Sequence, residues 1–83
     1  MLDYQYALSE AVAEYAFSLD PSDQSTLIEL FRALANNPYQ PGDFPDYDEV
    51  SRSLEVKLFD HWLVTYWSDH SAREVRILDV VRV

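Results

Sequence analysis

The sequence contains no cysteine, a single glycine and only six Lys and Arg residues against fifteen Asp and Glu residues. Without cysteine, neither a disulfide nor a thiolate metal site can stabilise the fold. A single glycine excludes the glycine-rich loops that cradle phosphate groups. No apolar run approaches the ~20 residues that span a bilayer, and the N-terminus lacks the basic and apolar segments of a secretory signal. We therefore expect a cytoplasmic protein that does not enter a membrane.

What the sequence does contain is enough apolar material for one compact core. Of its 83 residues, 48% are hydrophobic and 14% are aromatic. We predict a single domain over residues 1–83. A domain of this size buries only about two-thirds of the surface that its unfolded chain exposes, so a surface that binds a partner is compatible with its length.

The charge lies almost entirely on the N-terminal half. Residues 1–49 hold ten acidic residues and one basic residue, whereas residues 50–83 hold five of each, which gives the net charge of −9. A field of this sign repels nucleic acid, whose binding requires several Lys or Arg residues on one face. The acidic half either serves solubility or docks a basic partner.

Residues 2–8 alternate apolar and polar side chains, which predicts a first strand. A helix that begins at Asp3 is the alternative. Ser9 follows as a good N-cap, and the three-to-four spacing of the next apolar residues predicts a helix over 10–19.

A second helix is predicted over 21–36, because Asp20 can cap it and Pro21 suits its first position. Residues 37–51 hold three of the four prolines and the only glycine, and they predict an irregular loop. The loop carries three aromatic residues, and long loops in compact domains are often functional. These residues either pin the loop over the core or contact a partner: Tyr39, Phe44 and Tyr47.

Three β-branched and aromatic segments predict antiparallel strands over 53–59, 62–68 and 73–82. The middle segment is apolar on both faces, which is typical of a central strand that is covered on both sides. One face carries Trp62, Val64 and Tyr66, and the other carries Leu63 and Trp67. The two helices are expected to cover one face, which leaves the other for the loop, a second copy or a partner.

No motif identifies a reaction. Asp-His pairs occur at 60–61 and 69–70, but a strand of seven residues at ~3.3 Å each separates them by roughly 23 Å, so they cannot share a metal site. No nucleophile elbow accompanies the serines near His70. We therefore predict neither a metal nor a cofactor.

The order of strand, two helices, loop and three strands resembles the RelE/ParE superfamily, small bacterial toxins of type II toxin–antitoxin systems. The similarity is clearest at 54–58 (LEVKL), 62–66 (WLVTY) and 75–81 (VRILDVV), and Asn37-Pro38 is similar to the family's helix exit. This resemblance implies an α+β, two-layer fold with the order β-α-α-β-β-β.

The resemblance also implies a functional cluster that this chain lacks in large part. RelE-type toxins cleave messenger RNA on the ribosome with a cluster of Lys and Arg residues, usually with a Tyr. Lys57 matches one basic position, but Glu55 and Leu63 stand where relatives tend to carry bases. If the chain were such an endoribonuclease, its phosphate-contacting cations would be Lys57, Arg52, Arg76 and Arg82.

We therefore favour a RelE/ParE-like protein without catalytic activity that acts through protein–protein interaction. Its partner would be an antitoxin-like helix, a second copy of the chain or another target protein, as with ParE-type relatives and gyrase. The ribosome-dependent endoribonuclease is the alternative. The expected interaction surface consists of Trp62, Tyr66, Trp67, Tyr39, Phe44 and Tyr47.

Overall fold

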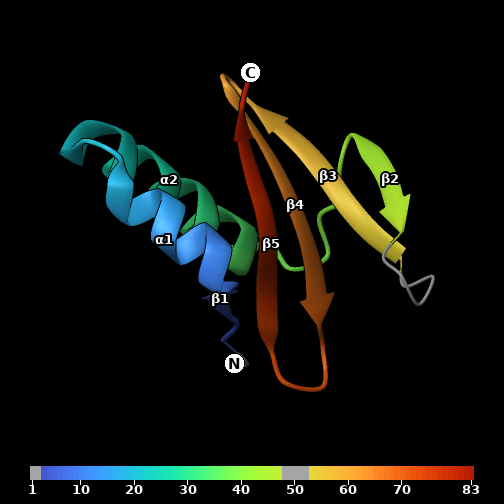
Figure 1. The fold of residues 1–83 in the computed structure, drawn as a ribbon. Coiled ribbons are helices and arrows are strands. Elements are labelled where there is room, and N and C mark those ends of the chain that lie inside the picture. The colour runs from blue at the N-terminus through green and yellow to red at the C-terminus, as the bar shows by residue number, and fades with distance from the viewer. Residues whose placement is uncertain (1–2, 48–52) are drawn as a thin grey trace.

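The structure is a computed structural model and describes residues 3–47 and 53–83. In these ranges the chain forms two helices beside a five-stranded sheet whose order is β1-β5-β4-β3-β2 (Figure 1). The elements are β1 (Gln5–Leu8), α1 (Glu10–Ser18), α2 (Pro21–Asn36), β2 (Phe44–Tyr47), β3 (Ser53–Phe59), β4 (Trp62–Asp69) and β5 (Glu74–Arg82).

The C-terminal strands form the predicted antiparallel meander, with β4 between β3 and β5. β1 lies parallel to β5, with Gln5 opposite Glu74 and Leu8 opposite Ile77. The register between β4 and β5 shifts at Thr65/Tyr66, which is the mark of a β-bulge. The α+β fold and its predicted order of elements are confirmed, and β2 is added at the edge of the sheet.

The prediction of an irregular loop throughout 37–51 is wrong for Phe44–Tyr47. These residues pair with β3 in antiparallel register, with Phe44 opposite Val56. Pro45 made this segment a poor strand candidate, because proline cannot donate to a β-ladder. At an edge strand, however, one row of backbone groups has no strand to pair with, and proline is tolerated. The remainder of that loop at 48–51, and residue 2 of the predicted first strand, lie outside the described residues.

Both helices begin where the sequence predicts, because a side chain caps each of them. The Ser9 hydroxyl accepts a hydrogen bond from the Val12 amide at 3.2 Å. The Asp20 carboxylate accepts one from the Asp23 amide at 2.9 Å, and Pro21 occupies the first turn of α2. Each cap therefore satisfies an amide that the helix itself leaves without a partner.

The main core lies between the helices and one face of the sheet. Its buried residues are Val12, Leu27, Phe31, Leu34, Trp62, Val64, Tyr66, Val75, Ile77 and Val80. Trp62 and Tyr66 are only 3% and 2% exposed. The prediction that these two residues belong to an interaction surface is therefore wrong. They lie on the face of β4 that the protein covers with its own helices and loop.

Candidate functional site

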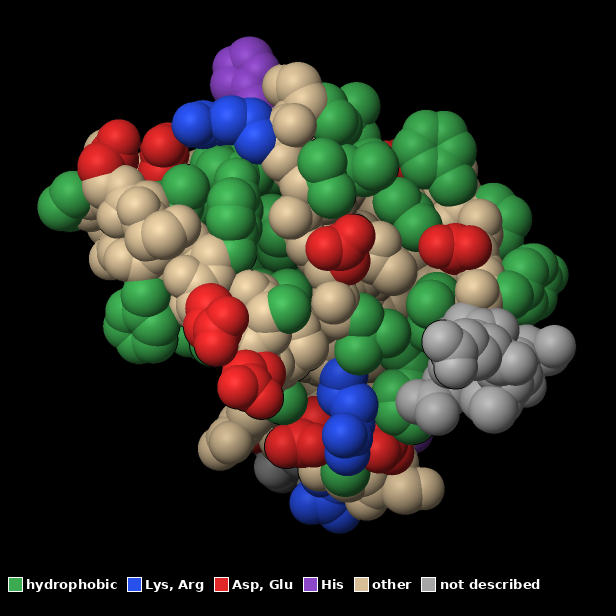
Figure 2. Space-filling model, in the orientation of Figure 1, with side chains coloured by type: hydrophobic (Ala, Val, Ile, Leu, Met, Phe, Trp, Pro, Cys, Tyr) green, Lys and Arg blue, Asp and Glu red, His purple; other side chains and the backbone are tan. Residues whose placement is uncertain are grey.

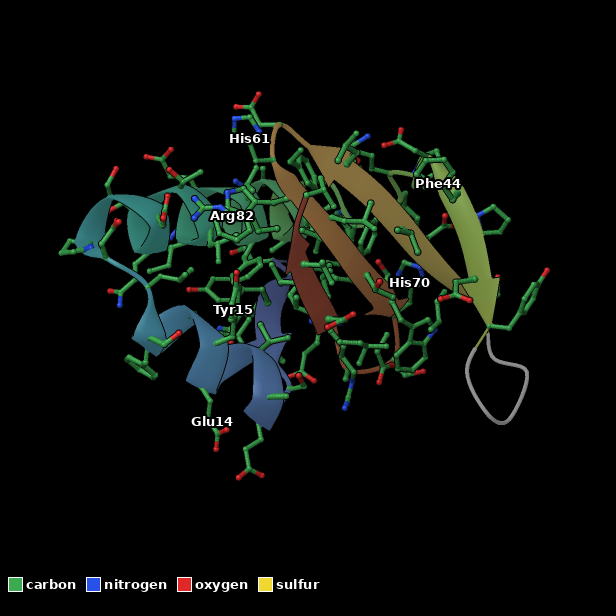
Figure 3. All side chains as sticks on the ribbon, turned by 45° about the horizontal axis from the view of Figure 1, so that its top comes forward. Glu14, Tyr15, Phe44, His61, His70 and Arg82 are labelled. Atoms are coloured by element: carbon green, nitrogen blue, oxygen red, sulfur yellow. The ribbon has the colours of Figure 1, made fainter. Side chains whose placement is uncertain are left out.

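The described cations nominated for phosphate binding do not all lie on one face of the sheet. Lys57 lies opposite Val64, a residue of the helix-covered face, whereas Arg76 lies opposite Trp67, whose side chain alternates to the other face. The side chain of Arg82 lies toward the helices (Figure 3). Arg52 lies outside the described residues.

Each of these three described cations also has an acidic partner. The Lys57 ammonium is 3.9 Å from the Asp43 carboxylate. The Arg82 guanidinium is 2.9 Å from the Asp23 carboxylate of α2 and lies over the Trp62 ring, 4.5 Å from its centroid. A phosphate would therefore have to compete with carboxylates that already neutralise these side chains.

Arg76 has the strongest set of acidic neighbours. Its guanidinium is 3.2 Å from carboxylate oxygens of both Asp69 and Glu74. It also lies over the Trp67 ring, 5.7 Å from the centroid. Glu74 lies two positions before Arg76 on β5. The tight β4–β5 connection brings Asp69 and Arg76 together, and the spacing of the two residues in the sequence does not by itself predict this contact.

The face of the sheet that points away from the helices is called the open face below. Its residues follow from the strand registers: Phe44, Asp46, Leu54, Val56, Leu58, Leu63, Thr65, Trp67, Asp69, Glu74, Arg76, Asp79 and Val81. Leu54 and Val56 are buried, whereas Phe44, Leu58 and Val81 are 53%, 46% and 44% exposed. Hydrophobic side chains gather over the strands at the right of Figure 2, and acidic ones lie singly among them.

Leu58, Leu63 and Val81 form one apolar row across three neighbouring strands of the open face. Leu63 lies opposite Leu58 on β3 and opposite Val81 on β5. Directly opposed side chains in a sheet lie about 4.5–5.5 Å apart at their β-carbons, so the row is continuous. None of these residues was predicted as interaction surface, although the two-faced apolar pattern of β4 had placed Leu63 on the second face.

The loop between α2 and β2 is fixed to the other face of the sheet by side chains of β3 and β4. The Ser68 hydroxyl donates to the Pro38 carbonyl at 2.7 Å, and the Tyr66 hydroxyl donates to the Gln40 carbonyl at 3.0 Å. The Gly42 amide donates to the Glu55 carboxylate at 2.9 Å. These bonds hold the loop close to the sheet.

Gly42 permits that close approach. A β-carbon at this position would lie 2.7 Å from the Val56 carbonyl oxygen and 2.8 Å from the Val56 nitrogen, closer than side chains allow. The backbone next to it continues the attachment, since the Asp43 amide donates to the Val56 carbonyl and the Asp43 carboxylate accepts from the Leu58 amide, both at 2.8 Å. The only glycine in the sequence indicates a loop, and its presence is also a signal for this close contact.

Beside the attached loop lies a hollow of about 380 Å³, which we call the loop hollow. Its lining includes Tyr39, Pro41, Ser53, Glu55, Ser68 and His70. The ring of Tyr39 stacks on the ring of His70 with centroids 4.7 Å apart and planes 11° apart. His70 also shares a 2.6 Å hydrogen bond with the Tyr4 hydroxyl. No Lys or Arg lines the loop hollow among the described residues.

Acidic side chains lie around the loop hollow, and their charges contribute to a raised pKa of the Tyr66 hydroxyl. Burial raises the pKa of the Tyr66 hydroxyl to about 12, and the charges of Glu55 and Asp43 act in the same direction. Both carboxylates disfavour the phenolate, as like charges do. An anion that entered this region would meet the same repulsion.

The two Asp-His pairs lie at opposite ends of β4, as His61 and His70 in Figure 3 show. Over 3–47 and 53–83, no group of three or more His, Asp or Glu side chains is arranged to hold a metal ion. In the same ranges, neither helix has both the length and the apolarity needed to cross a lipid bilayer.

Comparison with known proteins was informative only at the level of structure. No protein-family model matches the sequence, and no curated protein matches it. A chain of the toxin–antitoxin complex RelBE2 from Mycobacterium tuberculosis superposes with a TM-score of 0.79 at 18% identity, covering 99% of this chain and 100% of that one. The chain has the RelE-like toxin fold.

A second structure supports the same conclusion. A chain of the archaeal RelE-RelB complex from Pyrococcus horikoshii OT3 has a TM-score of 0.73 at 14% identity, covering 98% of this chain and 96% of the other. In this chain, Lys57 and Glu55 of β3 both contact the loop that follows α2. The described lining of the loop hollow includes the carboxylate of Glu55 and no Lys or Arg.

Proposed function

We propose that this protein is a RelE-like relative that acts in the cytoplasm by binding another protein through its open face. The partner is a protein of the antitoxin kind that contributes an amphipathic helix. The observation that carries this proposal is the apolar row of Leu58, Leu63 and Val81, which contrasts with cations that are paired with carboxylates and divided between the two faces of the sheet.

The geometry of the open face suits a helix. An amphipathic helix that lies on a sheet anchors itself through apolar side chains at i, i+3 and i+4. The row crosses β3, β4 and β5 and offers two side chains that are almost half exposed. Both structural relatives were determined as complexes of the toxin–antitoxin kind, which supports a protein occupant over a nucleic acid.

The test is a pull-down from the native cell that identifies the partner, followed by a binding assay with that purified partner. Leu58→Gln and Val81→Gln are each expected to weaken the complex about tenfold, because burying such a side chain contributes about 1.5–3 kcal/mol. Phe17→Gln is the matched control, since Phe17 is 82% exposed on α1, away from the open face.

Two results would overturn the proposal. One is a complex that Phe17→Gln weakens while both open-face variants bind normally. The other is cleavage of translated messenger RNA by the purified protein that disappears in Lys57→Ala, which would establish the endoribonuclease alternative. We expect no such cleavage, because the three nominated cations that the structure describes are paired with Asp43, Asp69, Glu74 and Asp23.

A further inference from the structure

The loop hollow differs in character from the open face, because it is polar, acidic and bordered by stacked rings. Its volume of about 380 Å³ falls in the lower part of the range of about 300–1,000 Å³ that is typical of sites for small ligands. It lies on the helix-covered side of the sheet, since Glu55 is opposite Tyr66 of the main core. Trp67, which the registers place on the open face, also lines the hollow, but no residue of the apolar row does.

We infer that the loop hollow receives a cationic side chain, an arginine of the partner protein, with Glu55 as its counter-charge. This inference rests on the proposed protein-binding function and specifies the chemistry of one contact. It adds a recognition site on the face of the sheet opposite the apolar row.

The negative charge of Glu55 favours a cationic ligand. Glu55 lines the hollow with a carboxylate, and one of its oxygens accepts the Gly42 amide at 2.9 Å. Each carboxylate oxygen has two lone-pair sites, so acceptor capacity is left for a guanidinium. The nearest described cation of β3, Lys57, belongs instead to the ion pair with Asp43.

The aromatic rings at the border of the hollow favour a planar cation. Tyr39 is mostly exposed, and one face of its ring stacks on His70. The ring also meets that of Tyr4 edge-on, with centroids 6.3 Å apart, but Tyr39 is 74% exposed, which leaves ring surface for a planar cation within about 6 Å of the centroid. Arginine suits this arrangement better than lysine, because a guanidinium both stacks on rings and binds carboxylates with a flat array of donors.

The hollow is already formed before a ligand binds. The hydroxyls of Tyr66 and Ser68 donate to the loop backbone and the Glu55 carboxylate accepts from it, so three points of the loop are held on the sheet. The carbonyls of Pro38 and Gln40 each accept one of these bonds and retain a second lone pair. Because the walls are positioned beforehand, little conformational freedom is lost when the ligand binds.

The test is an NMR titration of the full chain with Nα-acetyl-L-arginine amide. Its matched neutral probe is Nα-acetyl-L-citrulline amide, which has nearly the same shape without the charge. We expect the amide signals of Gly42, Ser68 and His70 to shift with the arginine probe and to respond at least fivefold more weakly to the citrulline probe.

Variants separate a specific site from general attraction to an acidic protein. Glu55→Gln is expected to weaken arginine binding at least fivefold, while its amide oxygen still accepts the Gly42 amide and preserves the loop. Glu29→Gln removes the same charge from an exposed position of α2 and is expected to leave binding unchanged. Tyr39→Leu tests the ring and is expected to weaken binding about threefold.

Three outcomes would overturn the inference: equal shifts with the two probes, shifts that lie outside the hollow, or equal weakening by Glu55→Gln and Glu29→Gln. Shifts of the same signals by inorganic phosphate, with none by arginine, would also overturn it and indicate an anion site. The result is distinguishable from failure of the proposed function, because the titration uses no partner and the open-face variants do not alter the hollow.

Discussion

At the scale of single residues, carboxylates determine what each cation can do. Asp43, Asp23 and Asp69 lie in different parts of the chain, and each contacts a Lys or Arg that a ribonuclease would need for phosphate. Exposed ion pairs contribute only about 0–1 kcal/mol each to stability. Their consequence here is functional, since a paired cation offers less of its charge to an incoming phosphate.

Tyr66 provides a prediction about pH at this scale. Its pKa is raised from 10.0 to about 12, so the folded protein keeps this proton at a pH where the unfolded chain loses it. The contribution to stability is complete below pH 10 and is lost as the pH rises toward 12. Between pH 9 and 11, ionisation of Tyr66 in the unfolded chain is expected to reduce the free energy of unfolding by about 1 kcal/mol. Urea unfolding of the wild type and of Tyr66→Phe at the two pH values measures this decline.

Tyr66→Phe is expected to be less stable than the wild type at pH 9, because the hydrogen bond to the Gln40 carbonyl is lost. Its free energy of unfolding is expected to fall less than that of the wild type between pH 9 and 11. Ser68→Ala is the matched control, since it removes the neighbouring bond to Pro38 without removing a group that titrates. Equal declines in the wild type and Tyr66→Phe would show that the environment of Tyr66 does not favour the phenol.

At the scale of elements, local signals predicted most of the fold. Ser9, Asp20 and Pro21 mark the helix starts, and these signals act within a few residues, so the sequence displays them directly. β2 was missed because its existence depends on pairing with β3, which no local pattern in FPDY reveals. The sequence likewise did not predict the parallel pairing of β1 with β5, because these strands lie near opposite ends of the chain.

The cap of α2 yields a prediction at this scale. Asp20→Ala is expected to lower the free energy of unfolding by about 1 kcal/mol, because the Asp23 amide loses its acceptor and the helix dipole loses a favourable charge. Thermal or urea unfolding near pH 7 measures the change.

Ser25→Ala is the control for that measurement, since Ser25 is exposed within the same helix and makes no cap. It is expected to change stability by no more than about 0.5 kcal/mol. A loss from Ser25→Ala as large as that from Asp20→Ala would mean that α2 responds to any change on its surface and not to its cap.

At the scale of the whole molecule, both candidate surfaces combine segments that are distant in sequence. The open face combines β2 to β5, and the loop hollow combines the loop after α2 with β3 and β4. The apolar pattern of β4 predicted a second apolar face, but Trp62 and Tyr66, which were expected at the surface, are buried. The hollow could not be predicted, because the attachment of Gly42 to Glu55 spans thirteen positions in the sequence.

Net charge is also a property of the whole molecule, and it predicts a response to salt. The charge of −9 is confined within a radius of gyration of 12.2 Å. At 0.01 M salt the screening length is about 30 Å, so all the carboxylates repel one another, whereas at 0.15 M it is about 8 Å. Raising the salt from 0.01 to 0.15 M is therefore expected to stabilise the folded state by about 1 kcal/mol, which corresponds to a rise in Tm of about 4–8 °C.

The ion pairs of Lys57, Arg76 and Arg82 act against this trend, because salt weakens them as well. The double variant Glu14→Gln/Glu29→Gln separates the two effects, since it changes the net charge from −9 to −7 and leaves those pairs intact. It is expected to be more stable than the wild type at low salt and to gain less from added salt. A wild-type Tm that falls between 0.01 and 0.15 M salt would show that the ion pairs outweigh the repulsion, and that the acidic surface is balanced within the fold without any basic partner.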